Sequence, residues 1–296
     1  MASFAIIRND WGIEVPESMS VNPERPRVVI DANKAVFLID WNEYLDKRDL
    51  FWFLALRDVK VRFKQAALGG AWAILKPLAL MVVFVVFLGH LVRFPTDGIP
   101  FPLFYYSGLV FWNFFVTAST LSSESLLSSS FLVTRVYCPI LYIPAAPVVA
   151  QFVDLGMAFV TLLALMLYCG VLPSIRLLII PALVLILLAS TLGVGLLFAP
   201  LVAKYRDFQN LVAVLTQMWF FMSPVIYPSS LVPDRWKVVY SLNPMAGAIE
   251  GLRWAIVGDA PFPASVLGAS LLSSVFLLAA GSISFMKNSN NVADFI

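Results

Sequence analysis

Charged residues are scarce in this sequence, and their scarcity narrows the class of protein first. Only 13% of the 296 residues are Asp, Glu, Lys or Arg, whereas soluble domains carry about 25%. The chain is 60% hydrophobic and has a mean hydropathy of +0.86. This composition indicates an integral membrane protein. The formal net charge of +2 is too small to indicate a nucleic-acid partner.

The sequence also lacks the motifs of common catalytic and nucleotide sites. It has one histidine, His90, so an H-E-x-x-H zinc site is excluded. It has no G-x-x-x-x-G-K-[ST] loop for ATP and no G-x-S-x-G nucleophile elbow. Two cysteines, Cys138 and Cys169, lie in or beside apolar stretches, which predicts free thiols. We therefore expect no catalytic residue, no metal and no bound cofactor. The first residues lack a leader pattern, so insertion is expected to use internal spans.

What the chain does have is a series of apolar runs of membrane-spanning length, roughly 17–25 residues each. They lie at residues 71–92, 101–121, 144–169, 177–200, 211–227 and 264–286. Lys and Arg near the ends of the spans are more numerous on the side of the membrane where the amino terminus would lie. This bias predicts that both termini are cytoplasmic. The sequence thus predicts an all-α membrane protein with six transmembrane helices. Its parts are a cytoplasmic extension (1–40), an interface helix (41–70) and a transmembrane domain (71–296).

Two features flank these spans. In the extension, short apolar runs at residues 28–30 and 35–39 indicate strands or a docked arm. Before the first span, a helix would carry a basic ridge of Arg57, Lys60 and Lys64 and an apolar ridge of Trp52, Leu56, Val59 and Phe63. Such a helix suits the cytoplasmic membrane surface. Residues 59–64 also alternate, which leaves a strand as the alternative.

One carboxylate lies inside a predicted span, at Asp154, with Gln151 one turn before it. A carboxylate is costly in lipid, so it is a candidate functional group. It indicates either proton coupling or a helix–helix hydrogen bond at a polar patch.

Aromatic residues make up 14% of the chain and crowd the second and fifth spans. Sugar rings can stack on aromatic faces, so these side chains predict a path for a glycan. A plain interfacial aromatic belt is the alternative. The path candidates are Phe104, Tyr105, Trp112, Phe114, Phe115, Trp219 and Phe220.

Residues 228–258 are too charged to span a membrane and too apolar for a solvated loop. We expect two short helices, broken at Asn243-Pro244, that dip into the outer side and return. The residues of this exit-side segment are Pro224, Tyr227, Pro228, Asn243, Pro244 and Arg253. Arg253 would meet an anionic group, or the segment would only cap the neighbouring spans.

Several motifs together resemble a known family. They are R-D-x-K-x-R-F-K-Q followed by L-G-x-x-W from Arg57, Y-R-D with Asn210, S-P-V-I-Y-P with a following V-P, N-P-M with Arg253, and the final A-D-F-I. In this order they resemble the ABC-2 type permease subunits of polysaccharide ABC exporters, which serve O-antigen, capsule and teichoic acid. The resemblance covers all but the first 40 residues.

The resemblance implies a homodimer bound to two copies of a separate ABC ATP-binding subunit, which would hold ATP and Mg. The complex would move an undecaprenyl-linked polysaccharide from the cytoplasm to the outer side of the bacterial inner membrane. The chain itself would not be an enzyme. The expected ATPase docking residues are Arg57, Asp58, Lys60, Arg62, Glu124 and Arg135. Export of another lipid or a drug, or ion-coupled secondary transport through Asp154, remain as alternatives.

Overall fold

The computed structural model describes residues 6–8, 14–16, 41–64, 69–131, 138–258 and 261–289. The chain divides into two units, Met1–Leu38 and Ile39–Ile296. In the first unit, β1 (Ile6–Arg8) pairs antiparallel with β2 (Glu14–Pro16). The sequence did not indicate this hairpin, which is an exception to the all-α prediction. The strands expected at residues 28–30 and 35–39 lie outside the described residues.

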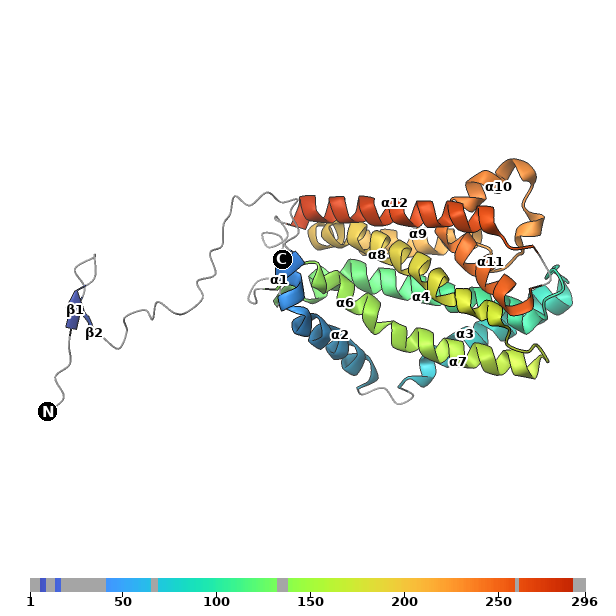
Figure 1. Ribbon diagram of the computed structural model, residues 1–296, viewed down its shortest axis with the longest axis horizontal. Coiled ribbons are helices and arrows are strands. Elements are labelled where there is room, and N and C mark those ends of the chain that lie inside the picture. Colours follow the sequence, from blue (N-terminus) through green and yellow to red (C-terminus); the bar gives the residue numbers. More distant parts are fainter. Residues whose placement is uncertain are drawn as a thin grey trace. The chain divides into compact units, whose positions relative to one another are not determined.

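The second unit is a helical bundle (Figure 1). Its elements are α1 (Trp41–Asp46), α2 (Arg48–Phe63), α3 (Ala71–Phe84), the π-helix η2 (Val85–Leu91), α4 (Phe101–Ser128), α6 (Tyr142–Ala150), α7 (Phe152–Tyr168), the 3-10 turn η3 (Ile175–Ile179), α8 (Ile180–Lys204), α9 (Phe208–Met222), the 3-10 turn η4 (Ser229–Leu231), α10 (Asp234–Ser241), α11 (Pro244–Val257) and α12 (Ala264–Ser289). Within this unit, α1 and α2 lie at one end of the bundle and α10 at the other (Figure 1).

Four helical stretches of the described chain are long and apolar enough to cross a membrane. They are Ala71–Leu91, Tyr142–Tyr168, Ile175–Lys204 and Ala264–Asn288. Two predicted spans, at residues 101–121 and 211–227, are not among them. α9 has 15 residues, which is about 22 Å of helix and shorter than the ~30 Å hydrocarbon core. α4 is long enough to span a membrane. It is less apolar than the four stretches above because other helices surround it.

α4 is the central helix of the bundle, because it packs against α3, α6, α7, α8, α9 and α11. The sequence predicts a polar inner loop from Glu124 to Tyr142, and the start of that loop is wrong, because the helix continues to Ser128. The Ser122 hydroxyl donates to the Pro144 carbonyl at 2.8 Å, and Ser125 donates to Ser122 at 2.7 Å. Hydroxyls that bond to carbonyls inside protein carry little cost, so this helix does not need the apolar surface of a lipid-facing one.

Backbone contact without intervening side chains joins α8 to α12. A Cβ atom on Gly193 would lie 2.6 Å from the Leu277 carbonyl carbon, and one on Gly281 would overlap the Gly193 carbonyl oxygen. Real Cβ atoms do not approach backbone this closely, so these positions require glycine for the observed spacing. The contact fixes α12 against α8, and α8 in turn packs on α4.

One further boundary differs from the sequence prediction. The run at 144–169 is divided at Gln151 into α6 and α7, and Pro147 has no N–H to donate to the preceding turn. The two short helices expected around Asn243 are present as α10 and α11. Cys138 and Cys169 both carry free thiols, as predicted.

Candidate functional site

At one end of the bundle, α2 confirms the predicted helix and rules out the alternative strand at residues 59–64. Leu54 and Ala55 are buried against Ala146 of α6. By contrast, Trp52 is 56% exposed and Leu56 is 55% exposed. The apolar ridge predicted from the sequence therefore faces partly away from the bundle, as expected for a helix on a membrane surface.

The expected docking residues are in different environments. Arg57 donates to its neighbour Asp58, with Nη2 2.8 Å and Nε 3.0 Å from Oδ1. Lys60 is exposed. Glu124 is half-buried on α4 rather than in a loop. Arg135 lies outside the described residues. Lys60 is thus the most accessible cation of the set that the structure describes.

Arg62 is engaged inside the bundle. Its Nη1 lies 2.7 Å from Asp154 Oδ2 and 2.5 Å from Gln151 Oε1, both at the start of α7. Gln151 Nε2 also donates to Asp154 Oδ2 at 2.6 Å. The sequence interpretation gave Asp154 no basic partner within a span; the partner comes from the interface helix instead. The sequence signal for this polar contact was the spacing of Gln151 and Asp154, which lie three residues apart and thus on one face of a helix.

A cavity of about 410 Å³ lies beside this ion pair. It is bordered by α2, α3, α4 and α7. The polar lining residues include Arg62, Lys76, Asn113, Thr117 and Asp154, and the aromatic ones are Phe63, Trp72 and Phe114. The cavity therefore combines two cations and one carboxylate with flat apolar faces. It can accommodate a group that is both polar and apolar.

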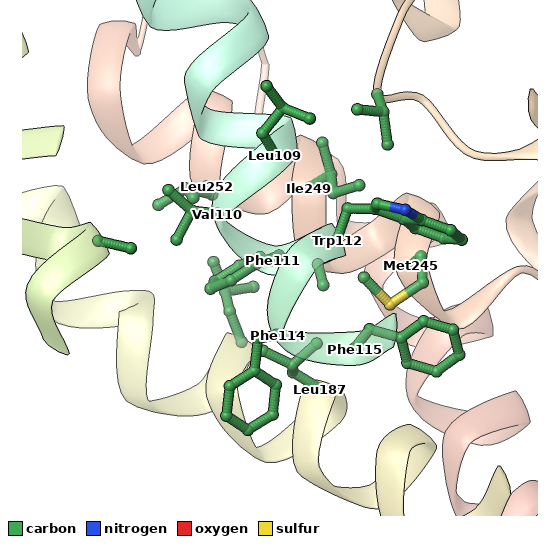
Figure 2. Close-up of a cluster of buried hydrophobic side chains, with 14 of the residues drawn as sticks. Leu109, Val110, Phe111, Trp112, Phe114, Phe115, Leu187, Met245, Ile249 and Leu252 are labelled. Carbon is green, nitrogen blue, oxygen red and sulfur yellow. The ribbon is translucent and has the colours of Figure 1, made fainter. Parts of the chain in front are cut away.

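The aromatic path candidates on α4 form part of the core. Figure 2 shows Trp112, Phe114 and Phe115 among Leu187 and Met245 of neighbouring helices. Trp112 is 6% exposed, Phe114 2% and Phe115 0%. Phe104 and Tyr105 are also buried. These five side chains are enclosed by protein within one subunit.

The series of ring contacts continues onto α9. The ring centroids of Phe115 and Trp219 are 5.2 Å apart, and those of Trp112 and Phe220 are 5.4 Å apart. Trp219 and Phe220 are half-buried, and the next residue, Phe221, is exposed. Phe114, Trp219 and Phe104 border three different cavities. Trp219 and Phe220 are thus the candidates nearest to a surface.

At the other end of the bundle, Asn243 connects several elements. Its Oδ1 accepts from Trp219 Nε1 and from the Met245 backbone N–H, both at 3.0 Å. Its Nδ2 donates to Ser223 Oγ at 2.9 Å and to the Met222 carbonyl at 3.2 Å. Its carbonyl accepts from Ser270 Oγ of α12 at 2.9 Å. Asn243 is the N-cap of α11, and it holds that cap against the end of α9.

The other exit-side residues surround this connection. Pro224, Pro228 and Pro244 are buried, and Tyr227 is half-buried. Tyr227 and Asn243 line an apolar cavity of about 910 Å³ together with Trp219, Trp236, Tyr240 and Phe276. The exit-side residues predicted from the sequence therefore lie together at one end of the bundle.

Arg253 of α11 is only 6% exposed. Its Nη2 donates to the carbonyls of Phe104 and Val225, both at 3.2 Å, and its guanidinium carbon lies 3.6 Å from the Phe104 ring centroid. Burial lowers the pKa of Arg253 to about 10, so the side chain stays charged at neutral pH. Its Nε has no hydrogen-bond partner among the described residues.

Two carboxylates accompany this arginine. Glu250 lies one turn earlier on α11 and accepts from the Tyr240 hydroxyl at 2.9 Å. Burial raises the pKa of the Glu250 carboxyl, and hydrogen bonds from Ser229 and Tyr240 and the charge of Arg253 oppose that rise. Asp97 accepts from Ser230 Oγ at 2.9 Å. Together with Trp254, these residues line a cavity of about 200 Å³. Sequence reasoning identified Arg253 but neither carboxylate.

Comparison with known proteins decides the family. The sequence model described as ABC-2 type transporter matches residues 49–257. The chain belongs to the ABC-2 type transporter family. Among its relatives is the O-antigen export system permease protein RfbA of Myxococcus xanthus, which is 30% identical over 258 residues covering 86% of this chain and 98% of that protein.

Other relatives of this ABC-2 type chain are also named for polysaccharide transport. An O-antigen export system permease protein RfbA of Klebsiella pneumoniae is 26% identical over 70% of this chain and 78% of that protein. The polysialic acid transport protein KpsM of Escherichia coli is 25% identical over 69% of this chain and 80% of that protein. The family match starts in α2 and ends with the last residue of α11. It therefore includes Arg62, Asp154, Asn243 and Arg253.

Proposed function

We propose that this chain is the membrane subunit of an ATP-driven exporter that moves a lipid-linked polysaccharide of the O-antigen type. Two copies of the chain would act with two copies of a separate ABC ATP-binding subunit, which holds ATP and Mg. The observation that carries the proposal is the similarity to an O-antigen export permease along 98% of that protein's length. The chain would carry cargo from the cytoplasm to the outer side of the bacterial inner membrane.

This function needs a membrane topology, and we propose six spans with both termini cytoplasmic. α4 has 28 residues, about 42 Å of helix, and its neighbours replace lipid around it. α9 presents an apolar surface at Val214, Met218 and Phe221, which suits lipid or a second copy of the chain. α10 and α11 would enter the outer side of the membrane and return, because proline and charged residues interrupt them.

The ATP-binding subunit is proposed to dock on α2, at the end of the bundle opposite α10. Lys60→Glu is expected to lower the permease-dependent ATP hydrolysis of the partner severalfold, since the exposed cation would meet a surface of opposite charge. The measurement is ATPase activity of the co-purified complex. Lys237→Glu, a matched reversal on exposed α10, should leave the rate unchanged. Equal rates for wild type and Lys60→Glu would remove Lys60 from the docking surface.

The glycan path is proposed to follow Trp219 and Phe220 rather than the enclosed rings of α4. In one subunit, Phe104, Tyr105, Trp112, Phe114 and Phe115 are already packed against protein. The half-buried rings of α9 lie at the margin of the bundle, where a second copy would complete a passage. Sugar faces would stack on these rings in passing.

Deleting the gene in its source bacterium tests the function directly. The expected result is loss of surface polysaccharide together with accumulation of the lipid-linked glycan on the cytoplasmic side. Unchanged surface polysaccharide would contradict the proposal and favour export of another lipid or a drug. Ion-coupled transport through Asp154 is disfavoured by its ion pair with Arg62, which already balances the carboxylate charge.

A further inference from the structure

The cavity of about 410 Å³ beside the ion pair of α2 and α7 is lined by three polar side chains whose role the ion pair does not explain. They are Lys76 of α3 and Asn113 and Thr117 of α4. Within the described part of the chain, none of the three side chains makes a hydrogen bond or an ion pair. Lys76 and Thr117 are exposed, and Asn113 is half-buried, with its amide atoms not among the fully covered ones. Their polar atoms are therefore open to a ligand.

The position of these side chains in the bundle makes an unpaired state costly. Lys76 belongs to the candidate span Ala71–Leu91 and lies about 8 Å along the axis from its start. A charged or polar group that faces lipid is unfavourable, and a lysine near the end of a span extends its ammonium group toward the lipid headgroups. Lys76 thus lies where a headgroup could supply its partner.

The lining of the cavity has one positive charge in excess. Arg62 and Asp154 neutralise each other at 2.7 Å, which leaves the ammonium group of Lys76. Lys76 is the remaining charged residue among those that line the cavity in the described chain. The cavity therefore favours an anion.

The other charged residues of the four bordering helices do not reverse this sign. On α4, Glu124 lies seven residues beyond Thr117, about 10 Å along the helix axis. Lys64, directly after α2, is an exposed cation. The remaining charged residues of α2 are two adjacent pairs of opposite sign and one further cation, namely Arg48 and Asp49, Arg57 and Asp58, and Lys60. Their sum is positive, so the surroundings add to the attraction for an anion.

The open groups are hydrogen-bond donors that suit a phosphate. A lysine ammonium has three N–H donors, an asparagine amide has two and a threonine hydroxyl has one. Asn113 and Thr117 are four residues apart, so they lie on one face of α4, and α4 packs against α3. A phosphodiester carries a single negative charge and matches the single excess cation. A diphosphate, which is more highly charged, does not match it.

The cavity opens beside an exposed apolar face of α3. Trp72 lies one turn before Lys76, lines the cavity and is 47% exposed, and Leu75 beside it is 45% exposed. Tryptophan is enriched at the level of the lipid headgroups. We propose that this cavity holds the phosphate of one membrane phospholipid, whose acyl chains lie along the exposed face of α3. This lipid would be a resident of the permease and not its cargo, so the proposal does not rest on the proposed function.

The test is native mass spectrometry of the full-length chain in detergent, titrated with dioleoyl phosphatidylglycerol, which has one phosphodiester and no amine. Lys76→Gln removes the charge, and Asn113→Leu removes the amide donors at similar size. Each should weaken binding of the first retained lipid about tenfold, as for loss of a hydrogen bond to a charged group. Lys287→Gln is the matched control, because Lys287 is an exposed lysine near the end of α12 and outside the cavity.

The expected result is a single tightly retained phosphatidylglycerol per chain in wild type and Lys287→Gln, and weaker retention in both cavity variants with unchanged melting temperature. No retained lipid in wild type, or equal retention in wild type and both cavity variants, would overturn the proposal. Displacement of phosphatidylglycerol by a lower concentration of undecaprenyl diphosphate would also overturn it and would assign the cavity to the carrier of the cargo. The measurement needs neither ATP nor the partner subunit, so its outcome is independent of the gene-deletion experiment.

Discussion

Gly281→Ala is expected to destabilise the folded chain by about 1–3 kcal/mol or more, as overpacking does. The added methyl group would overlap the Gly193 carbonyl oxygen of α8. Backbone cannot rotate away as a flexible side chain can, so α8 and α12 must separate along their contact. The measurement is the melting temperature of the purified protein, together with the fraction that remains monodisperse after extraction.

Gly268→Ala is the matched control on the same helix, because nothing lies within 4 Å of a Cβ atom there. Alanine favours helix over glycine by about 1 kcal/mol, so this variant should be as stable as wild type or more so. The two substitutions are chemically identical and should have opposite signs. A Gly281→Ala protein as stable as Gly268→Ala would show that α8 and α12 are not in backbone contact.

The second large effect is expected at the ion pair between α2 and α7. Arg62→Leu or Asp154→Leu alone should cost about 1–3 kcal/mol, because each leaves a partly buried group without its partner. The double variant should cost less than the sum of the two singles, since no unpaired charge remains. The measurement is a double-mutant cycle of unfolding free energies. Permease-dependent ATP hydrolysis should fall in the same order if α2 transmits the motion of the partner.

Arg57→Leu is the matched control for this cycle. It removes a cation from the same helix, but one paired with an adjacent and partly exposed Asp58. Surface pairs contribute about 0–1 kcal/mol, so the loss should be small. Additive effects of the Arg62 and Asp154 substitutions would contradict a direct coupling between the two side chains.

How much the sequence could predict depended on whether a feature was local. The interface helix, the break at Asn243 and the free thiols followed from charge spacing, proline and cysteine positions. The four candidate spans also followed, because a lipid-facing helix must be apolar along its length. α4 fails the same test since its neighbours surround it. A hydropathy pattern reports contact with lipid, and it cannot report a helix that is surrounded by other helices and whose serine hydroxyls bond to backbone carbonyls.

The candidate sites depended on pairs far apart in the chain. Arg62 and Asp154 are 92 residues apart and meet at 2.7 Å, and Ser230 meets Asp97 across 133 residues. Nothing in either local sequence marks the partner. The aromatic residues of α4 show the converse limit: their enrichment was evident, but only packing shows that Trp112 and Phe115 are enclosed within the subunit. The hairpin of β1 and β2 had no alternating pattern long enough to detect.

The hydrogen bonds of Asn243 have a mechanical consequence. One side chain joins the last turn of α9, through Trp219 and Met222, to the first turn of α11, through Met245. Its carbonyl is also held by Ser270 of α12. Helices are stiff along their axes, so a tilt of α9 must carry the start of α11 with it, unless all of these bonds break together. We therefore expect a tilt of α9 to be transmitted through Asn243 to the first turn of α11, the helix that carries Arg253.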